Sequence, residues 1–230
     1  MAGVTQTRSS ADGPFSGAQS NRSTGFFGAG GVGAHLDGLR VDASVRFGQQ
    51  RHSFERVVNN NLIAGGVEHA TASFNSRWFG VAGRVAYDLD MGNGLTVTPS
   101  FAASYTTGRV DGYTETGVVA PATVDSFRVS VLQYDPDLAV SRQIGGGTFS
   151  GSLGYVGRNA SGDNQVGVQI FGDQNSVPVS TGNYGAARVG LGHSMNLSTH
   201  TSVNFGGNVL LGGSKGMSGG AVSLGVSTRF

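Results

Sequence analysis

One stretch decides the fold: Gly220-Ala221-Val222-Ser223-Leu224-Gly225-Val226-Ser227-Thr228-Arg229-Phe230. Its even-numbered positions are mostly apolar and its odd-numbered positions are small or polar, which is the period of a β-strand with two different faces. An unpaired strand of this kind at the edge of a soluble sheet invites aggregation. Closing the sheet into a barrel removes the edge, and a bilayer solvates the apolar outer face. The stretch therefore predicts an all-β fold, an antiparallel transmembrane β-barrel whose last strand faces lipid.

The composition agrees with a β-rich chain. The 230 residues include 40 Gly, only 13% charged residues and no Cys, and the formal net charge is +1. Glycine disfavours helices, and few windows repeat apolar residues at helical spacing. A net charge near zero argues against nucleic-acid binding as the main role, because phosphate contacts need clustered Lys and Arg. No apolar run is long enough for a transmembrane helix, whereas barrel strands need only about 10 alternating residues each.

The same alternation recurs along the chain. Leu39, Val41 and Phe47 share one parity, and charged residues occupy the other. In a membrane barrel the charged parity faces the lumen. The predicted lumen-lining residues are Arg40, Asp42, Arg46, Arg84, Asp88, Arg128, Arg158, Arg188 and Arg229. Two interpretations stay open: a hydrated pore that holds an extended passenger or a plug through polar contacts, or wet positions that simply tolerate charge.

The connections between strands fall into two classes. Short ones are predicted at 37–38, 91–94, 145–147 and 198–200, and long ones at 48–70, 108–124 and 159–182. Outer-membrane barrels combine short periplasmic turns with long extracellular loops, whereas a soluble sandwich has no reason to sort loops by side. Nine strands are recognisable, and a tenth fits within residues 1–22. We therefore divide the chain into an N-terminal segment, 1–23, that is a loop or an incomplete strand, and a barrel, 24–230.

Several segments resemble autotransporter β-domains, the translocators of type V secretion. The C-terminal stretch resembles their final strand, and Gly83–Leu89 followed by Gly94–Tyr105 is similar to their strand, short turn and leucine-threonine-proline strand. The resemblance covers about residues 24–230. It implies a twelve-stranded outer-membrane barrel with a linker helix, and a passenger domain upstream. We expect about two further strands and that helix to precede the part recognised here.

The resemblance also implies partners and a location. They are outer-membrane lipid, the covalently linked passenger and the barrel-assembly machinery, which would read the terminal strand by β-augmentation. That signal is expected at Val222, Leu224, Val226 and Phe230. We expect a monomeric integral protein of the cell outer membrane, with the passenger side extracellular and no nucleic acid bound.

Two glycine-rich segments match catalytic or cofactor motifs by composition alone. Gly28–Gly33 fits a dinucleotide pattern but precedes no helix, and Gly216–Gly220 fits a nucleophile elbow but lies in a hairpin turn. The five histidines lack metal-ligand spacing. We therefore predict no catalytic residue, no metal, no cofactor and no enzyme activity. Two alternatives stay open: a stand-alone barrel acting as a narrow pore or as an adhesin through its loops, and an outer-membrane enzyme using Ser218.

Overall fold

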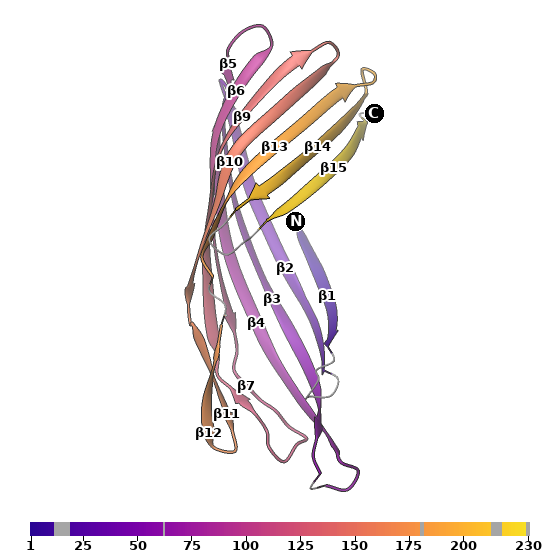
Figure 1. Cartoon of the computed structure of the whole chain (residues 1–230), viewed down its shortest axis with the longest axis vertical. Helices are drawn as coiled ribbons and strands as arrows, with labels where there is room; N and C mark the ends of the chain where they lie inside the picture. Colours follow the sequence, from indigo (N-terminus) through magenta and orange to yellow (C-terminus); the bar gives the residue numbers. More distant parts are fainter. Residues whose placement is uncertain (12–18, 62, 180–181, 213–217, 229–230) are drawn as a thin grey trace.

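The strands form one long, curved antiparallel sheet (Figure 1). The computed structural model describes residues 1–11, 19–61, 63–179, 182–212 and 218–228. The strand order is β1-β2-β3-β4-β6-β9-β10-β13-β14-β15, with β5 also paired to β6. Each strand of this path thus pairs with its neighbours in the chain, as in an up-and-down barrel. In the described ranges no helix is long and apolar enough to cross a membrane.

The bounds of the strands in the long sheet are β1 Ala2–Ala11, β2 Gln19–Leu36, β3 Leu39–Asn59, β4 Val67–Tyr87, β5 Leu89–Asp90, β6 Leu95–Val110, β9 Phe127–Ile144, β10 Gly147–Gly162, β13 Tyr184–Asn196, β14 Thr201–Leu211 and β15 Gly219–Thr228. A small second sheet joins β7 Tyr113–Thr114, β8 Thr123–Val124, β11 Gln165–Ile170 and β12 Asp173–Pro178. This architecture confirms the predicted all-β antiparallel fold class. The strands β1 and β15 lie at the two edges of the long sheet in the part of the chain described.

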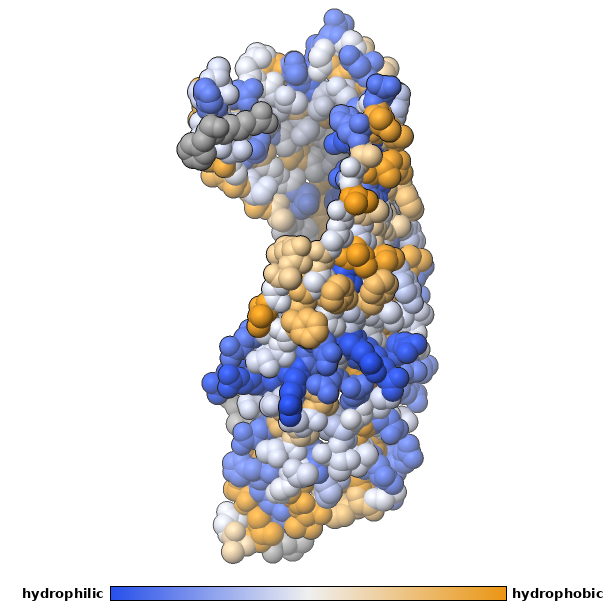
Figure 2. Space-filling view, turned by 180° about the vertical axis from the view of Figure 1, so that it is seen from behind, coloured by the Kyte–Doolittle hydropathy of each residue, from blue (hydrophilic) through white to orange (hydrophobic). Residues whose placement is uncertain are grey.

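The two faces of the long sheet differ in polarity. One face, here called the outer face, exposes apolar side chains on every long strand, for example Phe26, Phe47, Phe79, Phe101, Leu138, Leu191, Phe205 and Leu224. Figure 2 shows the resulting hydrophobic surface and a hydrophilic band directly below it. The opposite, inner face carries most of the charged residues of the strands and encloses small side chains such as Ala70 and Ala86. Exposed apolar side chains on this scale are what a lipid-facing surface requires.

The N-terminal segment is part of the sheet. Residues 2–11, for which the sequence left loop and strand open, pair with β2 over their whole length, from Ala2 opposite Gly28 to Ala11 opposite Gln19. The boundary drawn after residue 23 falls inside β2.

The connection predicted at 48–70 is much shorter than the sequence predicted, and the two predicted at 108–124 and 159–182 contain short strands. Strand β3 extends to Asn59 and β4 starts at Val67, so most of 48–70 is paired strand. Likewise β10 runs to Gly162, and β11 and β12 form a hairpin within 159–182. The prediction failed because apolar alternation stops where the outer face becomes polar, although backbone pairing does not depend on that alternation.

Two prolines lie inside central strands, and each faces a gap in the hydrogen-bonded ladder. Pro99 keeps its register with β9, opposite Leu138, while its other side faces the break between β4 and β5. Pro136 lies between Gly154 and Gly157 in the register with β10, where the pairing is interrupted. A proline has no N–H to donate, so it fits where the ladder is already open. Both prolines therefore lie within strands that continue past them, β6 and β9.

Several glycines make room for an aromatic ring on the next strand. Trp78 covers Gly48, and a Cβ built on Gly48 would lie 2.8 Å from the indole ring. Phe47 covers Gly28 and Tyr134 covers Gly157 in the same way. A ring that lies flat over a glycine shields the backbone of the neighbouring strand, which gives the high glycine content a packing role.

Gly48→Leu should destabilise the folded sheet by about 1–3 kcal/mol, because the new side chain displaces the Trp78 ring from its seat. The measurement is the unfolding midpoint in detergent micelles. Gly30→Ala is the matched control, since a Cβ there meets nothing within 4 Å. Adding Trp78→Ala to Gly48→Leu should recover part of the loss, and an unchanged midpoint for Gly48→Leu would refute the packing role.

Candidate functional site

The candidate site is the inner face of the long sheet, where most of the predicted lumen residues come together. Arg40, Asp42 and Arg46 of β3, Arg84 of β4, Arg158 of β10 and Arg188 of β13 all lie on this face, and Asp88 follows β4 with its carboxylate turned to Arg40. They come from strands that lie far apart in the sequence.

Arg128 lies on the opposite, outer face, so its predicted lumen position is a mistake in parity. It pairs with Arg109 in an unbroken register that also places Leu132 and Leu138 on the outer face. The prediction took its parity from Phe127, Val129 and Val131. Those residues lie at the loop end of β9, where apolar side chains do not mark the lipid face.

Arg188 forms ion pairs with two carboxylates on the inner face. Its Nη1 donates to Asp135 at 2.8 Å and its Nη2 donates to Asp137 at 2.6 Å. The two carboxylates stand on β9 and the guanidinium on β13, so the pair spans β10 above Gly154. A Cβ at Gly154 would lie 2.5 Å from Asp137 Oδ2, which explains why that position has no side chain. Asp135 and Asp137 were not among the predicted lumen residues, although both lie on the inner face.

A second ion pair closes the short-turn end of the inner face. The Arg40 guanidinium donates to Asp88 at 2.8 Å, and the Thr98 hydroxyl donates to the same carboxylate at 2.6 Å. These residues line a polar cavity of about 640 Å³. Further along the face, Asp42 stands opposite Arg84 and Arg46 donates to the Thr106 hydroxyl at 3.0 Å.

The third ion pair lies at the loop end and joins β3 to the segment between β7 and β8. Arg56 donates twice to the Glu115 carboxylate, at 2.7 Å each, and the Ala122 N–H donates to it at 3.0 Å. Glu115 is only 4% exposed. Beside it, His52, Phe74 and Tyr113 form a ring stack with centroid separations of 4.8 and 4.6 Å. This cluster could not be predicted from the sequence, because the segments of Arg56 and of Glu115 were both predicted to be loops.

The electrostatics of this cluster favour charged Glu115. Burial alone raises the pKa of the Glu115 carboxyl, but the hydrogen bonds from Arg56 and Ala122 and the charge of Arg56 outweigh it, so the pKa is lowered. The hydrogen bond to Glu115 raises the pKa of Arg56 in turn, and burial raises the pKa of the Tyr113 hydroxyl.

The predicted assembly signal lies partly on described residues. Val222, Leu224 and Val226 of β15 project from the outer face, with Leu224 73% exposed. Phe230 and Arg229 lie outside the described residues. No group of three or more His, Asp or Glu side chains that could hold a metal ion is found in the described part of the chain.

The comparisons with known proteins settle the family. The model of the autotransporter β-domain matches residues 1–208. The chain belongs to the autotransporter β-domain family. The transport unit of the autotransporter AIDA-I from Escherichia coli is similar over 99% of this chain and 89% of its own, at 12% identity and a TM-score of 0.31. No curated protein matches the chain.

Family membership confirms the resemblance seen in the sequence. It makes the chain an outer-membrane β-barrel domain of type V secretion and implies a linked passenger domain. We propose that the polar inner face is the wall of the lumen and that the apolar outer face is the lipid-facing surface.

Acidification should release the segment 113–124 from β3. Glu115 has a lowered pKa in the fold, so its contribution to stability is present above the ordinary carboxyl range of about 4 and is lost as pH falls through the folded value. Hydrogen exchange of 113–124, corrected for the intrinsic pH dependence, should accelerate over that range. In the Glu115→Gln variant the amides of 113–124 should exchange quickly at every pH. In the Glu55→Gln variant, which changes an exposed carboxylate, they should exchange as in the unaltered protein. Equal protection of the 113–124 amides in Glu115→Gln and in the unaltered protein at neutral pH would refute the role of the Arg56–Glu115 ion pair in holding this segment.

Proposed function

We propose that this chain is an outer-membrane translocator that supports the export or the surface anchoring of a passenger domain linked to its N-terminal side, and that it catalyses no reaction. The observation that carries the proposal is the division of one continuous sheet into a lipid-facing apolar surface and a polar wall with internally paired charges. Family membership supports the same function.

The inner wall suits the passage of an unfolded chain because its charges are largely compensated. Arg40 is balanced by Asp88, Arg188 by Asp135 and Asp137, and Arg56 by Glu115. Such a wall holds water without presenting a strong field of one sign, so neither acidic nor basic passenger segments are retained.

The orientation follows from the two ends of the sheet. The small sheet of β7, β8, β11 and β12 lies at the end with the long connections (Figure 1), which we assign to the extracellular side. The short turns then face the periplasm, and the assembly machinery is proposed to engage the edge strand β15 there. We propose that the barrel acts as a monomer.

A crosslinking experiment tests the path of the passenger. Ala102 and Ala103 are adjacent on β6 and lie on the inner and the outer face. The chain has no Cys, so each position can carry a single one. With one further cysteine in the segment that connects the passenger, Ala102→Cys should form a disulfide and Ala103→Cys should not. Crosslinking at Ala103→Cys alone would contradict passage along the inner face.

A reporter separates the translocator from the stand-alone pore or adhesin. A cysteine-free reporter fused on the N-terminal side should become sensitive to protease added outside intact cells. A reporter that stays in the periplasm while the barrel is inserted would favour the pore or adhesin instead. Catalysis would be indicated by hydrolase activity of the purified protein that Ser218→Ala abolishes.

A further inference from the structure

A row of six arginines crosses the outer face just beyond the hydrophobic belt. One arginine comes from each of six successive strands, β1, β2, β3, β4, β6 and β9: Arg8, Arg22, Arg51, Arg77, Arg109 and Arg128. They share the outer face with the exposed apolar residues of the same strands.

The register aligns these arginines across the sheet. Arg8 stands opposite Arg22, and Arg77, Arg109 and Arg128 stand opposite one another on three neighbouring strands. Arg51 connects the two groups, because it faces Thr24 on one side, two residues from Arg22, and Asn75 on the other, two residues from Arg77. Like charges directly opposite each other in a sheet are destabilising. An anion between the guanidinium groups would relieve this repulsion.

The protein supplies few of those anions. Asp111 lies 3.9 Å from Arg77 and 3.8 Å from Arg109, so one carboxylate serves both, and the outer-face carboxylate of Glu55 pairs with His69 at 3.1 Å. Asp163 accepts a hydrogen bond from the Arg128 main chain. Arg8, Arg22, Arg51 and Arg128 make no ion pair within the described residues, which leaves the row with a clear excess of positive charge.

The depth of the row corresponds to lipid headgroups. Phe79 lies two residues from Arg77, and Phe26, Phe47, Tyr105 and Leu132 each lie four residues from the arginine of their strand, toward the short turns. At about 3.3 Å per residue, the arginines therefore follow the last exposed apolar residues by about 7–13 Å along the strands. The difference in depth is somewhat smaller, because the strands of a membrane barrel are tilted. This depth is that of the interfacial layer of a bilayer, which lies outside its hydrocarbon core.

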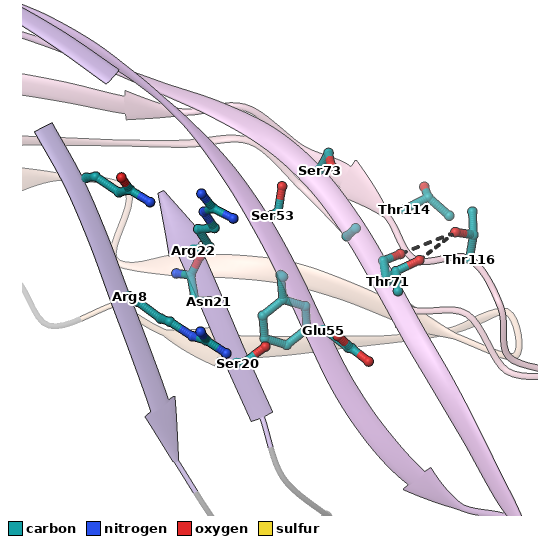
Figure 3. Close-up of a pocket in the computed structure, with 13 residues that line it drawn as sticks. Arg8, Ser20, Asn21, Arg22, Ser53, Glu55, Thr71, Ser73, Thr114 and Thr116 are labelled. Atoms are coloured by element: carbon teal, nitrogen blue, oxygen red, sulfur yellow. Dashed lines mark hydrogen bonds between the residues drawn. The ribbon is translucent and has the colours of Figure 1, made fainter. Parts of the chain in front are cut away.

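Two cavities on this surface include the arginines. One of about 310 Å³ is lined by Arg77, Arg109 and Arg128 together with Phe79 and Thr107, so three cations meet an apolar wall. The other, of about 730 Å³, holds Arg8 and Arg22 among serines and threonines, with Glu55 on the neighbouring strand (Figure 3). A phosphate group with an acyl chain attached fits the first arrangement, because guanidinium groups bind phosphate in a bidentate fashion and Phe79 faces the chain.

We infer that the arginine row binds the phosphate groups of lipopolysaccharide in the outer leaflet and so fixes the depth of the barrel in the membrane. The inference rests on the proposed function for its orientation, since the long-loop end must be extracellular for the row to meet this leaflet. The outer-membrane location itself follows from the family.

The test measures the melting temperature of the full-length protein, folded in uncharged detergent, on addition of four separate probes. They are lipopolysaccharide, enzymatically dephosphorylated lipopolysaccharide, phosphatidylglycerol and inorganic phosphate. A ligand that binds only the folded state raises the melting temperature. We expect a rise with intact lipopolysaccharide and a much smaller one with the other three. The variant Arg77→Gln/Arg109→Gln/Arg128→Gln should bind lipopolysaccharide about tenfold more weakly or worse, since charge-assisted guanidinium–phosphate bonds are the strong ones.

Two further variants keep the test decisive. Arg77→Lys/Arg109→Lys/Arg128→Lys retains the charge and should bind with intermediate strength. Arg46→Gln/Arg84→Gln/Arg158→Gln removes three inner-face arginines and should respond to lipopolysaccharide as the unaltered protein does. Both report on binding even if the first variant folds poorly.

Each remaining outcome contradicts the inference in a recognisable way. An equal response to inorganic phosphate would mean a free-anion site, and an equal response to phosphatidylglycerol would remove the assignment to the outer leaflet. An undiminished response in the outer-face glutamine variant would remove the role of the row. Reporter display in the same cells is scored separately, so a failed translocator and a failed lipid site are distinguishable.

Discussion

The absence of hydrogen-bonding solvent inside a bilayer is the constraint on which this structure depends. Every N–H and C=O group of a spanning segment must find its partner within the protein, and an antiparallel sheet provides those partners between neighbouring strands. The uninterrupted registers of β2 with β3 and of β3 with β4 meet this demand over about twenty residues each. Side chains are then free to differ between the faces, because they do not hold the sheet together. This freedom lets one sheet carry a lipid surface and a polar wall at once.

The exceptions obey the same constraint. Pro99 and Pro136 lie inside long strands, yet each is placed where the neighbouring ladder is already interrupted, so no acceptor loses a donor because of it. The glycines under Trp78, Phe47 and Tyr134 remove bulk where a ring must lie flat across the next strand. In a sheet of this size the residues with the weakest strand propensity thus stand where the packing needs them.

The sequence predicted the fold class and the facing of most strands, because alternation is strong wherever one face meets lipid. It predicted Arg40, Arg84 and Arg188 on the charged parity for that reason. It misplaced Arg128 because Phe127, Val129 and Val131 alternate at the loop end, where the outer face is polar. The ion pairs of Arg188 with Asp135 and Asp137, and of Arg56 with Glu115, could not be predicted from the sequence. Those contacts join segments 51 to 59 residues apart, and only strand register brings them together.

Charge is used in opposite ways on the two faces. On the inner face Arg40, Arg56 and Arg188 each have a carboxylate within hydrogen-bond distance, and the Arg188 guanidinium has two. On the outer face the arginines are set opposite one another with few carboxylates between them. Electrostatic repulsion within the protein would select against the second arrangement unless the anions came from outside.

The compensated face is the one assigned to a moving polypeptide, where retention would slow export. The uncompensated face is the one assigned to a layer of immobile phosphates, where retention anchors the barrel. A single strand such as β4, with Arg84 turned inward near the short turns and Arg77 turned outward near the long loops, serves both purposes because seven positions along a strand reverse the face.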